Sequence, residues 1–286
     1  MPHLGSFRKG WQSENLARFI LYKFSFVAHP STVADDIGSD FFCTLFEVHR
    51  EARYDYLLPK NSFAIQVKSN ADKVDVTDKL QYLENLEIPF FVGVVDRNGL
   101  KLTFYSGEYI PAFLSYKGVP GRLEIEPCER VLIQGPNGFF TQSDRDGYVL
   151  RFPKVVEIEA MTDGEELTAR VEAIRKTCSL VYENIARKRN GRYIFKEYRD
   201  NSCMVMAFTG PTSFQLYRNN LVESLAEAFI NLKWIYETSP DQFNEQEYRA
   251  YEGFFEQLKG LESHYGPLPE YIKLYFRELK ELVDGS

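Results

Sequence analysis

The sequence predicts an α/β core followed by a mainly helical segment, and three observations support this. Over roughly the first 110 residues, stretches rich in aromatic and β-forming residues alternate with stretches of helical apolar spacing. Hydrophobic residues make up 44% of the chain, and the 2 Trp, 18 Tyr and 23 Phe supply enough apolar material for a sizeable core. After residue 160 helical spacing dominates, so we expect one domain over residues 1–160 and a mainly helical domain over residues 161–286.

The core elements are expected in the order helix, strand, strand, helix, strand, strand. The first helix is predicted from Ser13 to about Phe26, because apolar residues recur every three or four positions and Ser13 is a suitable N-cap. The stretch 88–96 is continuously apolar, as is typical of a strand buried on both faces. The other expected elements are strands at 41–49, 62–69 and 101–106, a helix at 77–86, and short glycine-punctuated strands between 120 and 160.

The second part of the chain is predicted to be helical by its apolar spacing. The expected helices cover residues 165–188, 221–237, 245–261 and 270–283, and a strand is expected within 193–208. One apolar stripe is expected to be buried core or a contact between helices, and it consists of Leu225, Phe229, Leu232 and Ile235.

Composition excludes several classes of protein. The longest apolar stretch, 88–95, is far shorter than the roughly 20 residues of a membrane-spanning helix. The N-terminus lacks the pattern of a signal peptide, and the four cysteines lie far apart without a CxxC pair, so we expect a cytoplasmic protein without a disulfide framework. The four histidines show no spacing typical of a zinc site.

A local basic segment stands out in an acidic chain. The net charge of −7 and the pI near 5.3 argue against a nonspecific nucleic-acid coat. Residues 187–199 nevertheless hold six Arg or Lys against one Glu, with aromatic residues between them, which suits contact with phosphates and bases. The candidate nucleic-acid-binding residues are Arg187, Lys188, Arg189 and Arg192. The alternative is a solvated helix end followed by a turn at Asn190 and Gly191.

Several polar residues that could bind a metal or take part in catalysis lie in the predicted N-terminal core. Asp40 comes directly before the first predicted strand, and Gly38 two residues earlier allows a tight approach. In the next strand Gln66 and Lys68 point to one face, because side chains alternate along a strand. If the two strands pair as a hairpin with a long connection, Asp40 lies close to Gln66 and Lys68. Glu14, on the first helix, is placed to pack beside them.

The arrangement Glu14, Asp40 and Gln66-x-Lys68, each in the expected element, resembles the restriction-endonuclease-like PD-(D/E)xK nucleases, in the Mrr-related variant whose third motif is QxK. More narrowly, the GxDxF motif followed by the strand FAIQVKS is similar to uncharacterised nuclease-like domains of prokaryotic defence proteins. The resemblance covers about residues 10–110. It implies a mixed central sheet flanked by helices, and a metal-dependent endonuclease that hydrolyses phosphodiester bonds, with DNA as the expected substrate and RNA as an open alternative.

The resemblance also assigns roles to these residues. Asp40 is expected to bind Mg²⁺ or Mn²⁺ directly, with the amide oxygen of Gln66 and the carbonyl of Val67 as further ligands. Glu14 is expected to reach the metal directly or through water. Lys68 is expected to orient the attacking water or help to deprotonate it, and to offset charge in the transition state.

Several alternatives remain open at this point. Glutamine in place of an acid removes one charge from the site, so a noncatalytic nucleic-acid-binding or sensor subunit on the same fold is an alternative function. Taken singly, Glu14, Asp40 and Lys68 also fit a helix-dipole residue, a turn residue and an edge-strand residue. Asp35 and Asp36 are alternative carboxylates near Asp40, and of the two Asp36 is the candidate metal ligand. A third hypothesis is a protein-interaction subunit of a defence complex, with the C-terminal helices mediating homo-oligomerisation or partner docking.

Overall fold

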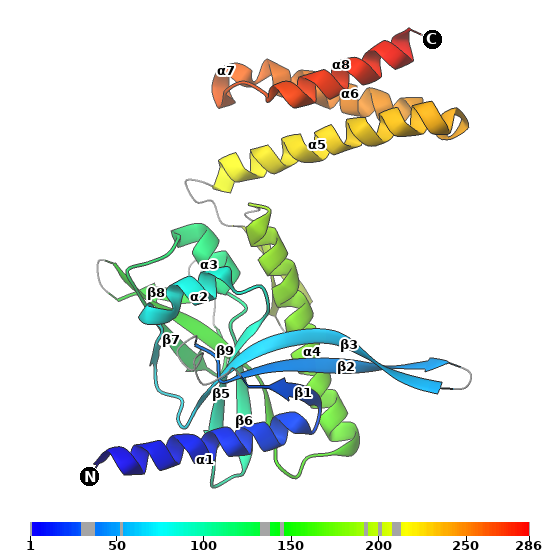
Figure 1. Ribbon diagram of the computed structural model, residues 1–286. Helices are drawn as coiled ribbons and strands as arrows, with labels where there is room; N and C mark the ends of the chain where they lie inside the picture. Colours follow the sequence, from blue (N-terminus) through cyan, green and yellow to red (C-terminus); the bar gives the residue numbers. More distant parts are fainter. Residues whose placement is uncertain are drawn as a thin grey trace. The chain divides into compact units, whose positions relative to one another are not determined.

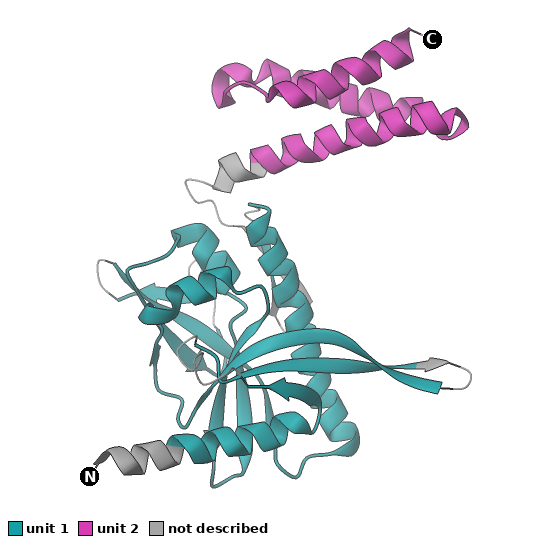
Figure 2. Ribbon diagram, viewed as in Figure 1, with its two compact units in different colours: residues 1–210 teal, residues 211–286 magenta. Residues whose placement is uncertain are grey.

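The computed structural model describes residues 2–29, 38–51, 54–131, 138–143, 146–191, 194–199, 202–207 and 213–285. The chain divides into two compact units, residues 1–210 and 211–286 (Figure 2). Within the described residues, no helix combines the length and apolar character that a membrane span requires.

Unit 1 contains a mixed β-sheet of nine strands drawn from the described residues. Its order is β1-β2-β3-β5-β6-β9-β7-β4, with β8 paired to β9 (Figure 1). The pairs β3/β5 and β7/β9 are parallel and the others antiparallel. The strands are β1 (Ser25–Ala28), β2 (Phe41–Glu51), β3 (Tyr54–Lys68), β4 (Val74–Asp75), β5 (Phe90–Asp96), β6 (Lys101–Ser106), β7 (Arg122–Cys128), β8 (Phe140–Gln142) and β9 (Gly147–Glu159).

Helices cover both faces of this sheet, which confirms the expected α/β class with a mixed central sheet. Helices α1 (Pro2–Tyr22) and α4 (Gly164–Arg189) bury one face, where Ala17 and Ile174 pack in one cluster with Phe63, Ile65 and Phe91. The opposite face is covered by the 3-10 helix η2 (Thr77–Lys79), α2 (Leu80–Asn85) and α3 (Ile110–Lys117). Its cluster includes Ala64, Leu83, Val92 and Phe113. Successive residues along β3, and likewise along β5, therefore point into different hydrophobic cores, because side chains alternate between the two faces of a strand.

The first helix ends earlier than its apolar spacing predicts. It stops at Tyr22, and residues 25–28 form β1, which pairs antiparallel with β2. In this strand Ser25 and Val27 are buried while Phe26 is exposed, so a two-residue alternation replaces the helical period.

The compact units do not divide near residue 160, where the sequence changes character. Helix α4 belongs to unit 1 because Val171, Ile174 and Cys178 pack into the sheet core. The hairpin of β10 (Ile194–Arg199) and β11 (Ser202–Ala207) also belongs to unit 1. The amide of Asn184 fastens it to α4: Oδ1 accepts from the Lys196 N–H at 2.9 Å and Nδ2 donates to the Lys196 carbonyl at 2.7 Å.

Unit 2 is helical, as predicted. It contains α5 (Ser213–Thr238), the 3-10 helix η3 (Pro240–Gln242), α6 (Glu245–Gly260), α7 (Glu262–Tyr265) and α8 (Glu270–Asp284). The side chain of Asn244 caps α6 by accepting from the N–H groups of Gln246 and Glu247. Its core includes Leu225, Phe229 and Leu232, so these members of the predicted stripe are confirmed as buried.

Strands β2 and β3 extend beyond their neighbours as a two-stranded ribbon (Figure 1). Strand β1 pairs only with residues 42–45 of β2, and β5 pairs only with residues 64–68 of β3. We call residues 46–51 and 54–60 the arm. A bulge between Leu45 and Phe46 marks its base, because Leu45 pairs with Asn61 whereas Phe46 pairs with Pro59.

Candidate functional site

Asp40 is attached to strand β3 at two points. Its backbone N–H donates to the Ile65 carbonyl at 2.9 Å, and its Oδ2 accepts from the Val67 N–H at 2.5 Å. The predicted pairing of the two strands is therefore confirmed, and it brings Asp40 beside Gln66. The long connection that we expected is instead largely paired, because both strands continue through the arm as far as the pair of Glu51 and Tyr54.

Gln66 and Lys68 lie on the same face of β3, as the alternation predicts. This is the face of Ala64, Val92 and the helices α2 and α3. Both side chains are half-buried. The Gln66 Oε1 atom is buried and has no hydrogen-bond partner among the described residues. A buried amide oxygen without a donor costs free energy, so this atom is suited to accept from, or to coordinate, a group outside the described chain.

Glu14 lies at the same end of the sheet but on the other face. It is half-buried in α1, which packs on the face of Ile65 and Val67. Two residues earlier, Gln12 accepts a hydrogen bond of 3.1 Å from Arg97, just beyond the carboxyl end of β5. Because β3 runs parallel to β5, with Lys68 beside Val94, this part of α1 reaches the sheet end that carries Lys68.

The start of β2 is held against α2 by contacts that the sequence did not predict. Gly38 has φ +100°, and a Cβ there would lie 3.2 Å from the Tyr82 ring and 3.3 Å from Lys79. The Ser39 and Tyr82 hydroxyls are 2.7 Å apart, and burial raises the pKa of Tyr82. In the sequence, Tyr82 is distinguished only as an aromatic residue with a hydroxyl group, within a helix predicted from the spacing of its leucines. Together these contacts fix the approach of the chain to Asp40.

The oxygen atoms near Asp40 suit a hard divalent cation, but few of them belong to carboxylates. Asp40 contributes a carboxylate, Gln66 a buried amide oxygen, and Val67 lies between Gln66 and Lys68 with a backbone carbonyl. The part of the chain that the structure describes holds no group of three or more His, Cys, Asp or Glu able to bind a metal. The candidates Asp35 and Asp36 lie outside the described residues.

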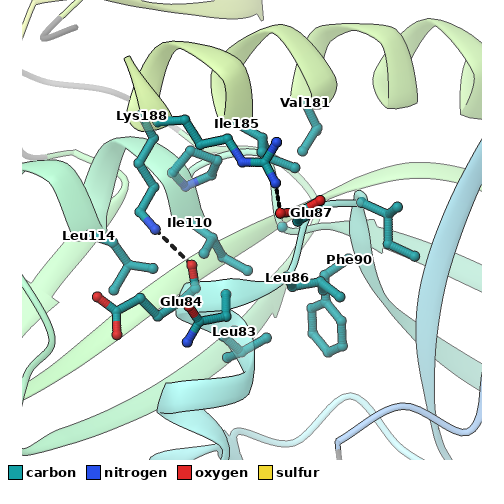
Figure 3. Close-up of a pocket in the computed structure, with 15 residues that line it drawn as sticks. Leu83, Glu84, Leu86, Glu87, Phe90, Ile110, Leu114, Val181, Ile185 and Lys188 are labelled. Carbon is teal, nitrogen blue, oxygen red and sulfur yellow. Dashed lines mark hydrogen bonds and ion pairs between the residues drawn. The ribbon is translucent and has the colours of Figure 1, made fainter. Parts of the chain in front are cut away.

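The basic segment has structural contacts at the end of α4. Lys188 Nζ donates to the Glu84 carbonyl at 2.7 Å, and Arg189 forms an ion pair with Glu87. Both residues line a cavity of about 220 Å³ whose walls include Leu83, Ile110 and Ile185 (Figure 3). Burial lowers the pKa of Lys188. Arg187 is half-buried, and Arg192 lies outside the described residues.

A buried acidic cluster was not anticipated from the sequence. Glu108 and Glu197 are both more than nine-tenths buried, and the Tyr109 hydroxyl donates to Glu197 Oε2 at 3.2 Å. Burial raises the pKa of Glu108 to about 7, and the neighbouring Glu197 adds to this effect. The cluster joins the start of α3 to β10 through the hydrogen bond between Tyr109 and Glu197, which are 88 positions apart in the sequence.

Comparisons with protein-family models, with curated proteins and with solved structures find no match.

Proposed function

We propose that this chain is a metal-dependent endonuclease that hydrolyses phosphodiester bonds of DNA, in a prokaryotic defence or restriction setting. The observation that supports it most is the attachment of Asp40 to the Val67 amide, beside a buried Gln66 oxygen that lacks a donor. The resemblance of the motifs to PD-(D/E)xK nucleases supplies the reaction and the setting.

Each residue has a defined part in this proposal. Asp40, Gln66 and the Val67 carbonyl would hold Mg²⁺ or Mn²⁺, and Glu14 would reach the ion directly or through water. The bound ion supplies Lewis acidity and lowers the pKa of a water molecule. Lys68 shares the strand face of Gln66, orients the attacking water and offsets the negative charge that develops on the phosphate.

The proposed DNA contacts are Arg187, Lys188, Arg189 and Arg192. Lys188 and Arg189 already connect α4 to Glu84 of α2 and to Glu87 just after α2. To bind phosphate they must exchange these contacts, so we expect a smaller contribution from them than a fully solvated cluster of four cations would make.

The test is cleavage of plasmid DNA with Mg²⁺ or Mn²⁺. We expect Asp40→Ala and Lys68→Ala each to lower the rate by about 100-fold or more, because each removes a group that acts in the transition state. Matched controls are Asp78→Ala and Lys73→Ala, which remove exposed charges from the same unit. Equal cutting by all five proteins would indicate a contaminating nuclease and contradict the proposal.

The same preparation separates the alternatives. DNA binding that survives in Asp40→Ala, without cutting by the wild type, would select a noncatalytic binding or sensor subunit. The protein-interaction alternative has its own support in unit 2, where Trp234 and Ile230 of α5 are exposed by 63% and 44%. Exposed large apolar side chains on a helix are typical of partner docking. A protein that shows no binding to DNA would favour the protein-interaction function.

A further inference from the structure

The arm carries exposed apolar side chains without any packed support. Five large apolar residues within it are between 43% and 68% exposed, namely Val48, Tyr54, Tyr56, Leu57 and Leu58. An isolated two-stranded hairpin is only marginally stable in water, and three or more strands are usually needed. A ribbon of this length and composition is therefore suited to gain a further strand.

Both edges of the arm lack a strand partner among the described residues, but the two edges differ. Strand β3 contains Pro59 within the arm, opposite Phe46. A proline is tolerated in a paired strand when its nitrogen faces outward, so the outer edge of β3 lacks a donor. The β2 edge over residues 46–51 contains no proline. At its base the Phe46 carbonyl accepts a hydrogen bond of 2.9 Å from Arg175 of α4, so this edge can accept a strand from Glu47 onward.

We propose that two copies of this chain associate through the β2 edges of their arms, antiparallel, with Val48 on the twofold axis. Such pairing is the isologous contact of a twofold dimer. Directly opposite residues of an antiparallel pair point to the same face, so a twofold perpendicular to the sheet must pass between two copies of the same residue.

Charge selects Val48 as that residue. With Val48 on the axis, Glu47 lies opposite His49 of the partner subunit, which places a carboxylate beside an imidazole twice by symmetry. With Glu47 or His49 on the axis, the two copies of that ionisable side chain would lie directly opposite each other, and for Glu47 like charges directly opposite are destabilising. The Val48-centred register pairs residues 47–49, beyond both the segment that β1 covers and the Phe46 carbonyl that Arg175 occupies.

The same register aligns apolar side chains. Val48 pairs with Leu57 within each arm, so the four-stranded sheet would carry a continuous row of Leu57, Val48 and their two copies in the partner subunit. On the other face of β2, Glu47 lies 3.1 Å from Lys60. The β2 edge of the arm lacks a strand partner among the described residues, and this edge and the pairing of Glu47 with His49 of the partner subunit argue for a protein strand as the occupant.

The first test is a disulfide trap in the full-length chain. Val48→Cys places two thiols opposite each other across the twofold, and we expect mild oxidation to give a covalent dimer on a nonreducing gel. The matched control is Val119→Cys, at a position of similar exposure outside the arm, 47% against 53%. Monomer from both variants, or equal dimer from both, would overturn the proposed register.

The second test measures mass in solution by sedimentation. Wild type is expected to be a dimer, and Val48→Lys to raise the dissociation constant by about tenfold or more, because it places two ammonium groups across the axis. Val119→Lys should leave the dimer unchanged. A wild type of one-chain mass at every concentration, or a dimer insensitive to Val48→Lys, would overturn the proposal. Because Val48 is exposed, circular dichroism should show both variants folded like wild type.

Discussion

Replacing the buried carboxyl of Glu108 with an amide, Glu108→Gln, should make the folding stability of unit 1 less dependent on pH. Burial raises the pKa of Glu108 from its ordinary 4.5 to about 7, while the unfolded chain keeps the ordinary value. The protonated carboxyl therefore contributes stability that is fully present below pH 4.5. This contribution is lost as the pH rises through 7.

The size of the effect follows from the two pKa values. A difference of about 2.5 in pKa, at about 1.4 kcal/mol for each pKa unit, gives about 3 to 4 kcal/mol as an upper value. Glutamine retains the shape and cannot ionise, so we expect Glu108→Gln to match wild type at pH 4.5 and to exceed it by about 1–3 kcal/mol at pH 8.

Urea unfolding at both pH values is the assay. The chain has two tryptophans, Trp11 in unit 1 and Trp234 in unit 2, so a Trp234→Phe background lets fluorescence follow unit 1 alone. The control is Glu129→Gln, which removes a carboxylate whose side chain is 77% exposed. A stability difference between Glu108→Gln and wild type that is equal at pH 4.5 and pH 8 would refute the reasoning.

Two further predictions concern the sheet and the site. Gly93→Ala should lower stability by about 1–3 kcal/mol in urea unfolding, because its Cβ would lie 2.8 Å from Ile65 Cδ1 and 3.0 Å from Leu102 Cδ1. Gly253→Ala in α6, with nothing within 4 Å, should not destabilise, and equal losses would contradict this. Gln66→Glu should tighten Mn²⁺ binding about tenfold or more in calorimetry, since about 1.4 kcal/mol of added attraction suffices. Unchanged affinity would remove Gln66 from the ligand set.

Strand β2 was predicted to within two residues of its observed end, whereas β3 begins at Tyr54, eight residues before its predicted start. Strands β5 and β6 match their predicted ranges closely. Helix α3 was missed for a physical reason: Ile110, Ala112, Phe113 and Leu114 are all buried, so the helix has no polar face to produce a period. Pro111 lies in the first turn of this helix, where proline is well tolerated.

Within the candidate site, the sequence predicts only those positions that depend on the pairing of two strands. The adjacency of Asp40 to β3 followed from two neighbouring strands, whereas the face on which Glu14 lies depends on how α1 crosses the sheet. The contact of Tyr82 with Ser39 spans 43 positions and leaves no pattern in the sequence. The division into compact units at residue 210 also leaves no signal in the sequence, because a change from strands to helices does not reveal that α4 packs on the sheet.

The bulge at the base of the arm separates the length of the arm from the geometry around Asp40. Residues 41–45 and 61–65 keep their pairing on the sheet side of the bulge, whatever lies beyond it. Adding or removing one residue pair at the tip would therefore lengthen or shorten the ribbon without displacing the Asp40 carboxylate from the Val67 amide. Arms of different reach could in this way diverge among related chains while the polar end of the sheet stays the same.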